Sequence, residues 1–305
     1  MEKQKIKLIT HNDLDGVGCY IVAKYLFGDT CDIDVSFCTH HSLKEVLDET
    51  ILCMNEFNRI YITDIAPTEE YFDLFFSKAF IDKTELFDHH KTSEFLTDYD
   101  FSHVHVEKNR VLQSGTTLFY EYLKGLEGIN KPTQYLEEFV ELIRLWDTWD
   151  WYKTNNLEAK ALNDLLYLKG IKWFYKDMLV LLDEDEGLFS AVDEIMLTYE
   201  ADKKKRYIKA KSKEIIEYDL DDYHIGVIFA EQYVSELGNN VCEQHPEFDF
   251  VVVVSGKTCS FRTVKENIDV SEIAKLYGGG GHPKASGCPI SKEKQLEYIT
   301  SILRD

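Results

Sequence analysis

The sequence predicts an α/β protein that combines a mostly parallel sheet with a second, smaller α/β domain. In the first third of the chain, short apolar runs alternate with segments of helical periodicity, which is typical of βαβ units. New strand-like runs begin only after a long charged segment that contains neither glycine nor proline. We therefore expect a first domain over residues 1–187, a connector helix over 188–220 and a second domain over 221–305.

The elements of the first domain follow from its periodicity. Strands are expected over 5–10, 32–38, 59–65 and 84–87. Helices are expected over 16–27, over 42–49 with Ser42 as N-cap, and over 68–79. In a parallel sheet with helices on both faces, ligands bind at the carboxyl ends of the strands. Polar residues at those ends are therefore candidates for a functional site.

The rest of the chain is predicted to be helical and then mixed. Helices are expected over 116–123, 133–146 and 172–182, followed by one long helix over 188–218. In the second domain, strands are expected over 224–230, 248–255 and 258–264, and helices over 234–243, 270–276 and 292–303. The basic run at 203–206 favours a solvated helix face over a nucleic-acid patch.

Composition excludes several classes of protein. The 305 residues are 44% hydrophobic, and a formal charge of −21 argues against a protein that coats long duplex nucleic acid. The seven cysteines form no CxxC pair, which argues against a disulfide framework or a zinc–thiolate site. The longest apolar run is too short to cross a membrane, and no apolar leader follows the charged start of the chain. We expect a cytoplasmic protein without membrane contact.

Acids and imidazoles follow three of the predicted strands. These residues are His11, Asp13, Asp15, Asp64, Asp88, His89 and His90. Each has an ordinary interpretation when taken alone: a helix N-cap for Asp13 or Asp15, a turn residue for Asp64, and surface polarity for the two histidines. Taken together, they predict one polar cluster, because the carboxyl ends of parallel strands lie along one edge of the sheet.

Several carboxylates in one cluster require a positive partner, because they would otherwise repel each other. Lysine and arginine are scarce in these segments, with Lys91 the nearest, so a divalent metal is predicted. Carboxylates and imidazoles without thiolates suit Mn²⁺, with Mg²⁺, Co²⁺ or Fe²⁺ as alternatives. The number of ligands exceeds the needs of one ion and favours two, an arrangement that is used to hydrolyse phosphoesters.

A further carboxylate lies in the segment LIRLWDTWDW. Asp147 ends an apolar helical pattern and is a candidate for the second metal, with Asp150 as the competing choice. The alternative is a helix-end aspartate among core tryptophans. Trp146, Trp149 and Trp151 are compatible either with core packing or with stacking on a nucleotide base.

The segment GGGGHPKASG, over 278–287, is a candidate for anion binding. A glycine run allows backbone N–H groups to converge on a phosphate, and His282 and Lys284 would add positive charge. The stretch from Lys257 to Lys284 contains five basic residues, among them Arg262, and three acidic residues, so its net charge is positive. The whole chain, in contrast, is strongly acidic. The alternative is a flexible loop without a ligand.

These motifs, in this order, resemble the DHH phosphoesterase family. HNDLDG, TDIAP, FDHH and the aspartate of LWDTWDW are similar to its four metal-binding motifs, and GGGGHPKASG is similar to the glycine–histidine motif of the C-terminal DHHA1 domain. The likeness covers nearly the whole chain and is strongest to the oligoribonuclease (nanoRNase) branch of NrnB type. It implies two α/β domains, DHH and DHHA1, joined by a helix, with the active site in the cleft between them.

The resemblance also implies residue roles. His11, Asp13 and Asp64 would hold one Mn²⁺ ion, and Asp15, Asp64, His89 and Asp147 the other, with Asp64 as the bridge. His90 would contact the reacting phosphate, and Asp88 would orient the histidines. The far phosphate or terminal nucleotide of the substrate would be bound by Arg262, Gly279, Gly280, Gly281, His282 and Lys284.

The implied activity is that of a metal-dependent exoribonuclease that degrades short single-stranded oligoribonucleotides or dinucleotides to mononucleotides. A first alternative is a phosphodiesterase or phosphatase for small nucleotides, such as linear or cyclic dinucleotides, cyclic mononucleotides or 3′-phosphoadenosine phosphate. A second alternative is a catalytically silent nucleotide-binding regulator, which would have lost ligands that this chain retains. No long duplex is expected as partner, and a homodimer is compatible with the sequence.

Overall fold

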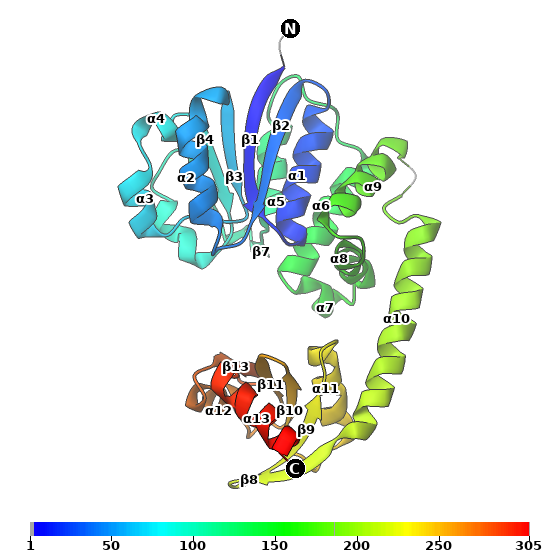
Figure 1. Ribbon diagram of the computed structural model, residues 1–305. Coiled ribbons are helices and arrows are strands. Elements are labelled where there is room, and N and C mark those ends of the chain that lie inside the picture. The colour runs from blue at the N-terminus through cyan, green and yellow to red at the C-terminus, as the bar shows by residue number, and fades with distance from the viewer. Residues whose placement is uncertain (1–2, 186, 305) are drawn as a thin grey trace. The chain divides into compact units, whose positions relative to one another are not determined.

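The computed structural model describes residues 3–185 and 187–304, so positions 1, 2, 186 and 305 of the predicted domains lie outside the described residues. The chain divides into two compact units, Met1–Leu197 and Thr198–Asp305. The boundary between them falls within helix α10 (Ala191–Lys211), part of the predicted connector (Figure 1). The predicted domain limits at 187 and 220 stay a prediction.

The first unit is built on a five-stranded parallel sheet in the order β2-β1-β3-β4-β5. The strands are β1 (Gln4–His11), β2 (Cys31–Cys38), β3 (Arg59–Thr63), β4 (Thr84–Asp88) and β5 (Ser102–Val104). The first four are the predicted strands, and the predicted parallel sheet is confirmed. Thr10 pairs with Thr63, which pairs with Phe87, so the ends of β1, β3 and β4 lie side by side.

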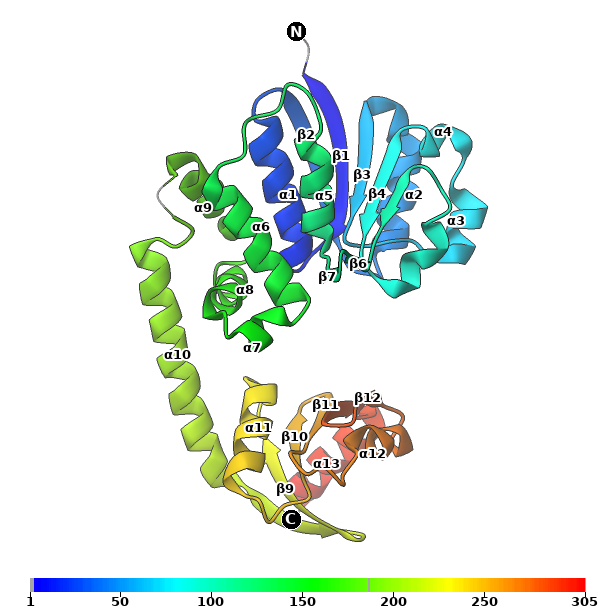
Figure 2. The ribbon, with the colours of Figure 1, turned by 180° about the vertical axis from the view of Figure 1, so that it is seen from behind.

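Helices cover both faces of this sheet, as predicted (Figures 1 and 2). Successive side chains of β1 point to opposite faces of the sheet. Ile6 and Leu8 therefore belong to one apolar core, and Ile9 belongs to the other. The first core includes residues of α1 (Leu14–Phe27) and α5 (Gly115–Lys124), and the second includes residues of α2 (Leu43–Cys53), α3 (Glu69–Phe75) and α4 (Lys78–Ile81).

The described part of the first unit also contains two 3-10 helices, Met54–Glu56 and Lys91–Leu96, four further α-helices and one small hairpin. The α-helices are α6 (Gln134–Asp147), α7 (Asp150–Thr154), α8 (Leu157–Lys169) and α9 (Ile171–Glu184), and the hairpin joins β6 (Glu107–Lys108) to β7 (Val111–Leu112). Residues of α6, α8 and α9 extend the core that α1 and α5 form.

Two helix predictions in this unit need correction. The helix expected over 68–79 is two helices, because the hydroxyl of Ser77 accepts a hydrogen bond from the N–H of Phe80 and starts α4 anew. Ser42 precedes α2 as expected, but its side chain makes no capping bond. Its hydroxyl instead accepts from the N–H of Thr39.

The second unit contains a six-stranded mixed sheet in the order β12-β13-β11-β10-β9-β8. The strands are β8 (Ile216–Leu220), β9 (Tyr223–Phe229), β10 (Phe250–Ser255), β11 (Thr258–Arg262), β12 (Gly280–His282) and β13 (Ala285–Pro289). Its helices are α11 (Val234–Gln244), α12 (Val270–Leu276) and α13 (Lys292–Arg304). Two apolar cores line the sheet, one with residues of α12 and the other with residues of α11.

The long helix expected over 188–218 ends earlier, at Lys211. A short 3-10 turn over Ser212–Glu214 leads into β8, which pairs antiparallel with β9. Ile216 and Tyr218 alternate with Glu217 and Asp219, which is the period of a strand. The segment has no glycine or proline to mark the change, so its pairing with β9 decides its conformation. Within the described residues, no helix combines the length and the apolar character that a membrane span requires.

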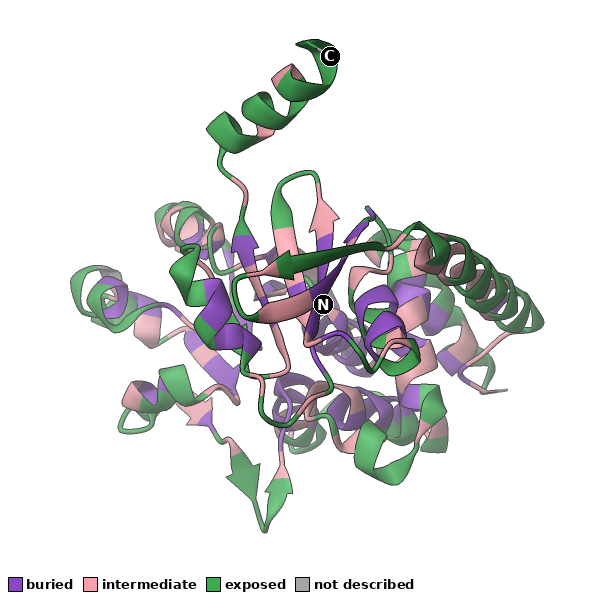
Figure 3. Cartoon of the chain, turned by 90° about the horizontal axis from the view of Figure 1, so that it is seen from below, coloured by how far each residue is buried: buried purple, intermediate pink, exposed green. Residues whose placement is uncertain are grey.

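Burial differs strongly between helices (Figure 3). The middle of α1 is buried, whereas every residue of α13 is intermediate or exposed. Along α10, only Asp193 is buried, and the residues of the basic run at 203–206 are exposed or half-buried.

Candidate metal centre

The carboxyl edge of the parallel sheet brings the predicted acids and histidines together. The Nε2 atom of His89 lies 3.3 Å from Asp64 Oδ1, 3.3 Å from Asp147 Oδ2 and 3.7 Å from Asp15 Oδ2. These side chains follow β4, β3, α6 and β1, so four separate segments converge at one point.

The cluster contains three overlapping groups of potential ligands. Two of them correspond to the predicted ion sites, His11, Asp13 and Asp64 for one and Asp15, His89 and Asp147 for the other, and the third comprises Asp64, Asp88, His89 and His90. The Nδ1 atom of His11 is 2.7 Å from Asp13 Oδ2 and 3.9 Å from Asp64 Oδ2. Because the two oxygens of Asp64 face different groups, its carboxylate lies where a bridge between two ions would be needed.

Asp64 has an unfavourable backbone conformation. It follows β3 with φ 57°, in the left-handed region, which residues other than glycine, asparagine and aspartate seldom adopt. Its N–H donates to the carbonyl of Phe87 at 2.8 Å, and only 1% of the residue is exposed. Left-handed residues of this kind cost of order 1–3 kcal/mol and cluster at functional sites.

Asp15 also binds the N-terminus of a distant helix, a contact that the sequence did not predict. Its carboxylate accepts hydrogen bonds from the backbone N–H groups of Gly115 at 2.6 Å and Thr116 at 2.8 Å, at the start of α5. The helix N-terminus favours this negative charge. The ordinary N-cap interpretation holds for Asp13, whose carboxylate accepts from the N–H of Gly16. Asp15 thus connects the cluster to a helix 100 residues further along the chain.

Gly115 was missed by the sequence analysis. A Cβ atom at this position would lie 2.6 Å from the Cβ and 2.9 Å from the Cα of Asp64, closer than side chains tolerate. Only glycine therefore allows the start of α5 to contact both Asp15 and Asp64. Ser114 caps α5 by accepting a hydrogen bond from the N–H of Thr117, but the sequence contains no signal for the close approach of Gly115 to Asp64.

The electrostatics of the cluster call for a cation. Burial, together with the charges of Asp15 and Asp13, raises the pKa of Asp64 well above its usual value and the pKa of Asp147 to about 8. Asp64 Oδ2 and His89 Nε2 are buried and have no hydrogen-bond partner within residues 3–185 and 187–304. Orphaned ligand atoms amid carboxylates fit divalent metal ions.

The second DHH histidine differs from the first. His90 Nδ1 lies 2.7 Å from Asp88 Oδ1, and this bond raises the pKa of His90 above its usual value. Asp88 is fully buried and also accepts from Ser93 Oγ and from the N–H of His89. Burial acts to raise the pKa of Asp88, but the bond from His90 and its other donors outweigh it and lower that pKa. Asp88 therefore fixes the orientation of the His90 ring.

The two candidate carboxylates of the tryptophan-rich segment have different surroundings. Asp147 joins the cluster through His89. Asp150 binds elsewhere, with Oδ2 3.1 Å from Arg144 Nη1 and Oδ1 2.7 Å from Lys153 Nζ. The geometry therefore brings Asp147, and not Asp150, to the metal ligands.

His40 is a further residue at this edge that was missed. Its ring centroid lies 5.4 Å from that of His11 and 6.3 Å from that of His90. It follows β2, the neighbour of β1, so the strand-end argument applied to the segment FCTHH would have found it. His40 is exposed, whereas the candidate ligands are buried or half-buried.

Known proteins resemble this chain in sequence. The chain is 38% identical to the oligoribonuclease NrnB of Bacillus subtilis over 97% of this chain and 76% of that protein. The chain belongs to the DHH phosphoesterase family. Its residues 230–305 match the DHHA1 domain. A 3′,5′-cyclic-nucleotide phosphodiesterase of Helicobacter pylori is 24% identical over 92% of this chain and 91% of that protein.

Two solved structures show the same fold. The pGpG-specific phosphodiesterase PggH of Vibrio cholerae superposes with a TM-score of 0.55 at 16% identity, covering 98% of each chain. The exonuclease RecJ bound to manganese superposes with a TM-score of 0.51 at 13% identity, covering 97% of this chain and 88% of that one.

The glycine motif of the DHHA1 domain is not the loop that its sequence predicts. Gly280–His282 form β12, which pairs antiparallel with β13 at the edge of the sheet. A Cβ at Gly279 would lie 2.0 Å from the carbonyl oxygen of Gly287, so close strand packing explains that glycine. The edge position leaves the backbone groups on the outer side of β12 unpaired in the sheet and available to a ligand.

The basic residues predicted for the DHHA1 domain have protein partners. Arg262 donates to Ser235 Oγ at 2.7 Å and to the carbonyls of Phe261 and Ser286, and burial lowers its pKa. Lys284 donates to the carbonyl of Lys265 and lies 3.6 Å from Glu266. His282 is exposed. An anion bound here would have to share Arg262 and Lys284 with these partners.

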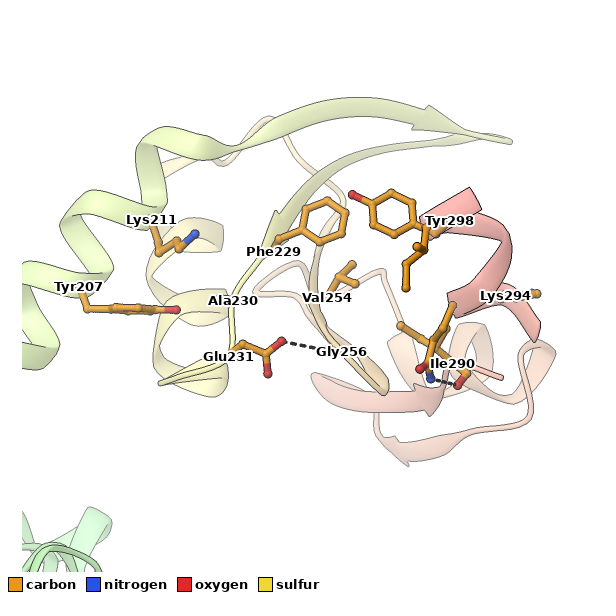
Figure 4. Close-up of a pocket in the computed structure, with 12 residues that line it drawn as sticks. Tyr207, Lys211, Phe229, Ala230, Glu231, Val254, Gly256, Ile290, Lys294 and Tyr298 are labelled. Carbon is orange, nitrogen blue, oxygen red and sulfur yellow. Dashed lines mark hydrogen bonds between the residues drawn. The ribbon is translucent and has the colours of Figure 1, made fainter. Parts of the chain in front are cut away.

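A pocket of about 620 Å³ lies elsewhere in the C-terminal unit (Figure 4). Phe229 and Tyr298 stack across it with ring centroids 5.8 Å apart, and Glu231 accepts the N–H of Gly256. Its lining is mainly apolar, and none of the predicted site residues belongs to it.

Replacing Asp147 by asparagine is expected to alter the pH dependence of stability in the metal-free protein. The pKa of Asp147, about 8, exceeds that of the unfolded chain, so the folded state retains a proton that the unfolded state has released. The stability from this proton is present at low pH and is lost between about pH 4 and pH 8.

Asparagine does not titrate, so the melting temperature of D147N relative to the wild type should rise by about 2 °C or more from pH 5 to pH 8. The control is D150N: Lys153 and Arg144 lower the pKa of Asp150, so this carboxylate is ionised in both the folded and the unfolded state from pH 5 to pH 8, and its removal should leave the pH slope unchanged. Equal pH slopes for D147N and wild type would contradict the prediction.

Proposed function

We propose that this protein is a metal-dependent phosphodiesterase that degrades short single-stranded oligoribonucleotides to nucleoside monophosphates. The observation that carries the proposal is the position of Asp64 between two ligand groups at one sheet edge. The family membership and the name of the Bacillus subtilis relative, an oligoribonuclease, support it. We propose two Mn²⁺ ions, with Mg²⁺ or Co²⁺ as substitutes, since carboxylates and imidazoles suit these metals.

The chain's own residues have distinct roles in this proposal. His11 and Asp13 hold one ion, Asp15, His89 and Asp147 hold the other, and Asp64 contacts both. Bound divalent ions supply positive charge that holds the phosphate and makes a water more acidic. His90, held by Asp88 and with a raised pKa, offers its Nε2 proton to a phosphate oxygen or to the leaving oxygen. Asp88 acts through His90.

The substrate is proposed to be short, because the acidic chain repels long polyanions while the metal centre attracts a single phosphate. In the DHHA1 domain, Arg262, Lys284, His282 and the outer edge of β12 are proposed to contact the far end of the substrate. Small nucleotides are a second candidate substrate class. The names of the cyclic-nucleotide and pGpG phosphodiesterases among the similar proteins favour this class.

The test is a panel of substrates incubated with the Mn²⁺-loaded protein. A 5′-labelled pentaribonucleotide should give a ladder ending in mononucleotide, and a linear diribonucleotide should give mononucleotides. A protein that leaves the pentamer intact but rapidly cleaves a cyclic nucleotide or pyrophosphate would disprove the proposal. A protein that binds nucleotides and cleaves none of them would instead be the silent regulator.

His40→Gln is expected to reduce kcat/KM by about 10- to 100-fold, because His40 is placed beside His11 and His90, where an imidazole N–H can reach a substrate phosphate. His41→Gln is the matched control, since His41 is the adjacent exposed histidine. Steady-state kinetics on the diribonucleotide measure both variants. Equal values for the two variants would exclude a role for His40.

A further inference from the structure

We infer that Trp146, Trp149 and Trp151, called here the tryptophan cluster, form the platform on which a nucleobase next to the reacting phosphate stacks. Trp149 supplies the surface that contacts the base. This inference rests on the proposed function and names the part of the substrate, beyond its phosphate, that the catalytic unit recognises.

The three indole rings of the cluster lie close together and nearly parallel. The ring centroids of Trp146 and Trp151 are 5.4 Å apart with planes 26° apart, and Trp149 lies 6.4 Å from Trp146 and 6.2 Å from Trp151, with planes 23° and 33° apart. Trp146 and Trp151 pack against the apolar core, which gives the cluster a fixed base. Trp149 has 66% of its surface exposed, so it contributes little to that core.

Trp149 has a backbone conformation that is unfavourable for a bulky residue. Its φ is 63°, and its N–H donates to the carbonyl of Trp146 just past the end of α6, where helices commonly place a glycine. A bulky side chain in this conformation costs stability. Backbone preference and burial therefore do not account for a tryptophan at this position. One face of its ring packs with Trp146 and Trp151, and its exposed surface is open to a ligand.

The position of Trp149 connects it to the metal centre. Asp147, which lies 3.3 Å from His89, is two residues before Trp149, and two residues span at most about 7 Å. An indole anchored at that distance is within reach of a base whose phosphate is held at the cluster of acids.

The turn that presents Trp149 is held firmly. Arg144 donates to both oxygens of Glu141, to Asp150 at 3.1 Å and to the carbonyl of Leu112 at 3.3 Å. Its side chain is only 10% exposed, so these bonds fix the turn between α6 and α7. A fixed aromatic surface binds a base without the cost of ordering it first.

The chemistry of the platform defines its ligand. Every nucleobase has a π face, so stacking tolerates all sequences and requires an unpaired base. The platform therefore selects single-stranded substrates and does not read sequence. Stacking of one base contributes about 1–3 kcal/mol, equivalent to a change in affinity of roughly 5- to 150-fold.

The test uses the full-length Mn²⁺-loaded protein and a diribonucleotide, compared with analogues in which one of the two nucleotides has no base. Trp149→Gly should raise KM for the diribonucleotide by roughly 5- to 150-fold with kcat changed less than about threefold, and Trp149→Phe should restore most of the affinity. One of the two abasic analogues should show no difference between wild type and Trp149→Gly. The control is Trp173→Ala, because Trp173 is 59% exposed yet lies beneath Lys172 and Lys176.

Thermal melting separates this inference from a purely structural role. Trp149→Gly relieves the left-handed strain, so its melting temperature should equal or exceed that of the wild type. A lower melting temperature with equal losses on all three substrates would overturn the inference, as would an unchanged KM in a variant of an active enzyme. Failure of the wild type to cleave any oligoribonucleotide would instead disprove the proposed function.

Discussion

Replacing Asp64 by asparagine is expected to reduce metal-dependent hydrolysis by about 10³-fold or more. Asparagine keeps the size of the side chain and accepts the left-handed backbone at least as well as aspartate, so the geometry around β3 is preserved. It offers one neutral oxygen where aspartate offers two charged ones. Even the loss of one hydrogen-bond donor that stabilises a transition state costs about 10²–10³-fold, and a shared ligand affects both ions.

Three measurements would complete this test. Kinetics on a diribonucleotide give the loss of activity, and titration with Mn²⁺ should show weaker binding of both ions. In the metal-free state, D64N should melt at or above the wild-type temperature, because the buried carboxyl with its raised pKa is removed. The matched variant D150N should remain active, since Asp150 binds Arg144 and Lys153. An active D64N enzyme would refute the two-ion arrangement.

Gly115→Ala is expected to impair the enzyme without removing any polar group. The added methyl would lie 2.6 Å from the Cβ of Asp64, so α5 and the strand end must separate. That movement lengthens the bonds from Gly115 and Thr116 to Asp15 and displaces two metal ligands together. We expect a loss of about 1–3 kcal/mol in the free energy of unfolding and of about 10²-fold in kcat.

Gly256→Ala serves as the control, because the nearest atom to an added Cβ there is a carboxylate oxygen of the flexible Glu231, at 3.5 Å. Urea unfolding gives the change in stability, and Mn²⁺-dependent turnover gives the change in activity. If G115A and G256A have the same stability and the same turnover, the close approach of α5 to Asp64 does not position the site.

The sequence predicted the parts of this fold that follow from local pattern. Apolar alternation located the first four strands of the parallel sheet, and a topological rule then placed acids from β1, β3 and β4 at one edge. The same rule covers His40 after β2 and was not applied there. The sequence could not decide whether Asp147 or Asp150 is the candidate metal ligand, because the answer depends on which of the two carboxylates Arg144 binds.

Other features depend on contacts that a single sequence does not display. The segment over 216–220 is a strand because β9 lies beside it, and the glycine run is a strand because β13 requires small residues against it. Gly115 is essential to the geometry only because Asp64, far away in the chain, occupies the space where its side chain would be.

The bonds from Gly115 and Thr116 to Asp15 span 100 and 101 residues, and Asp147 follows later still. During synthesis on the ribosome, His11, Asp13 and Asp15 therefore emerge long before their partners exist. Chains terminated before α6 lack Asp147, one member of the second ligand group. The complete set of candidate metal ligands can therefore come together only after Asp147, near the middle of the chain, has been translated.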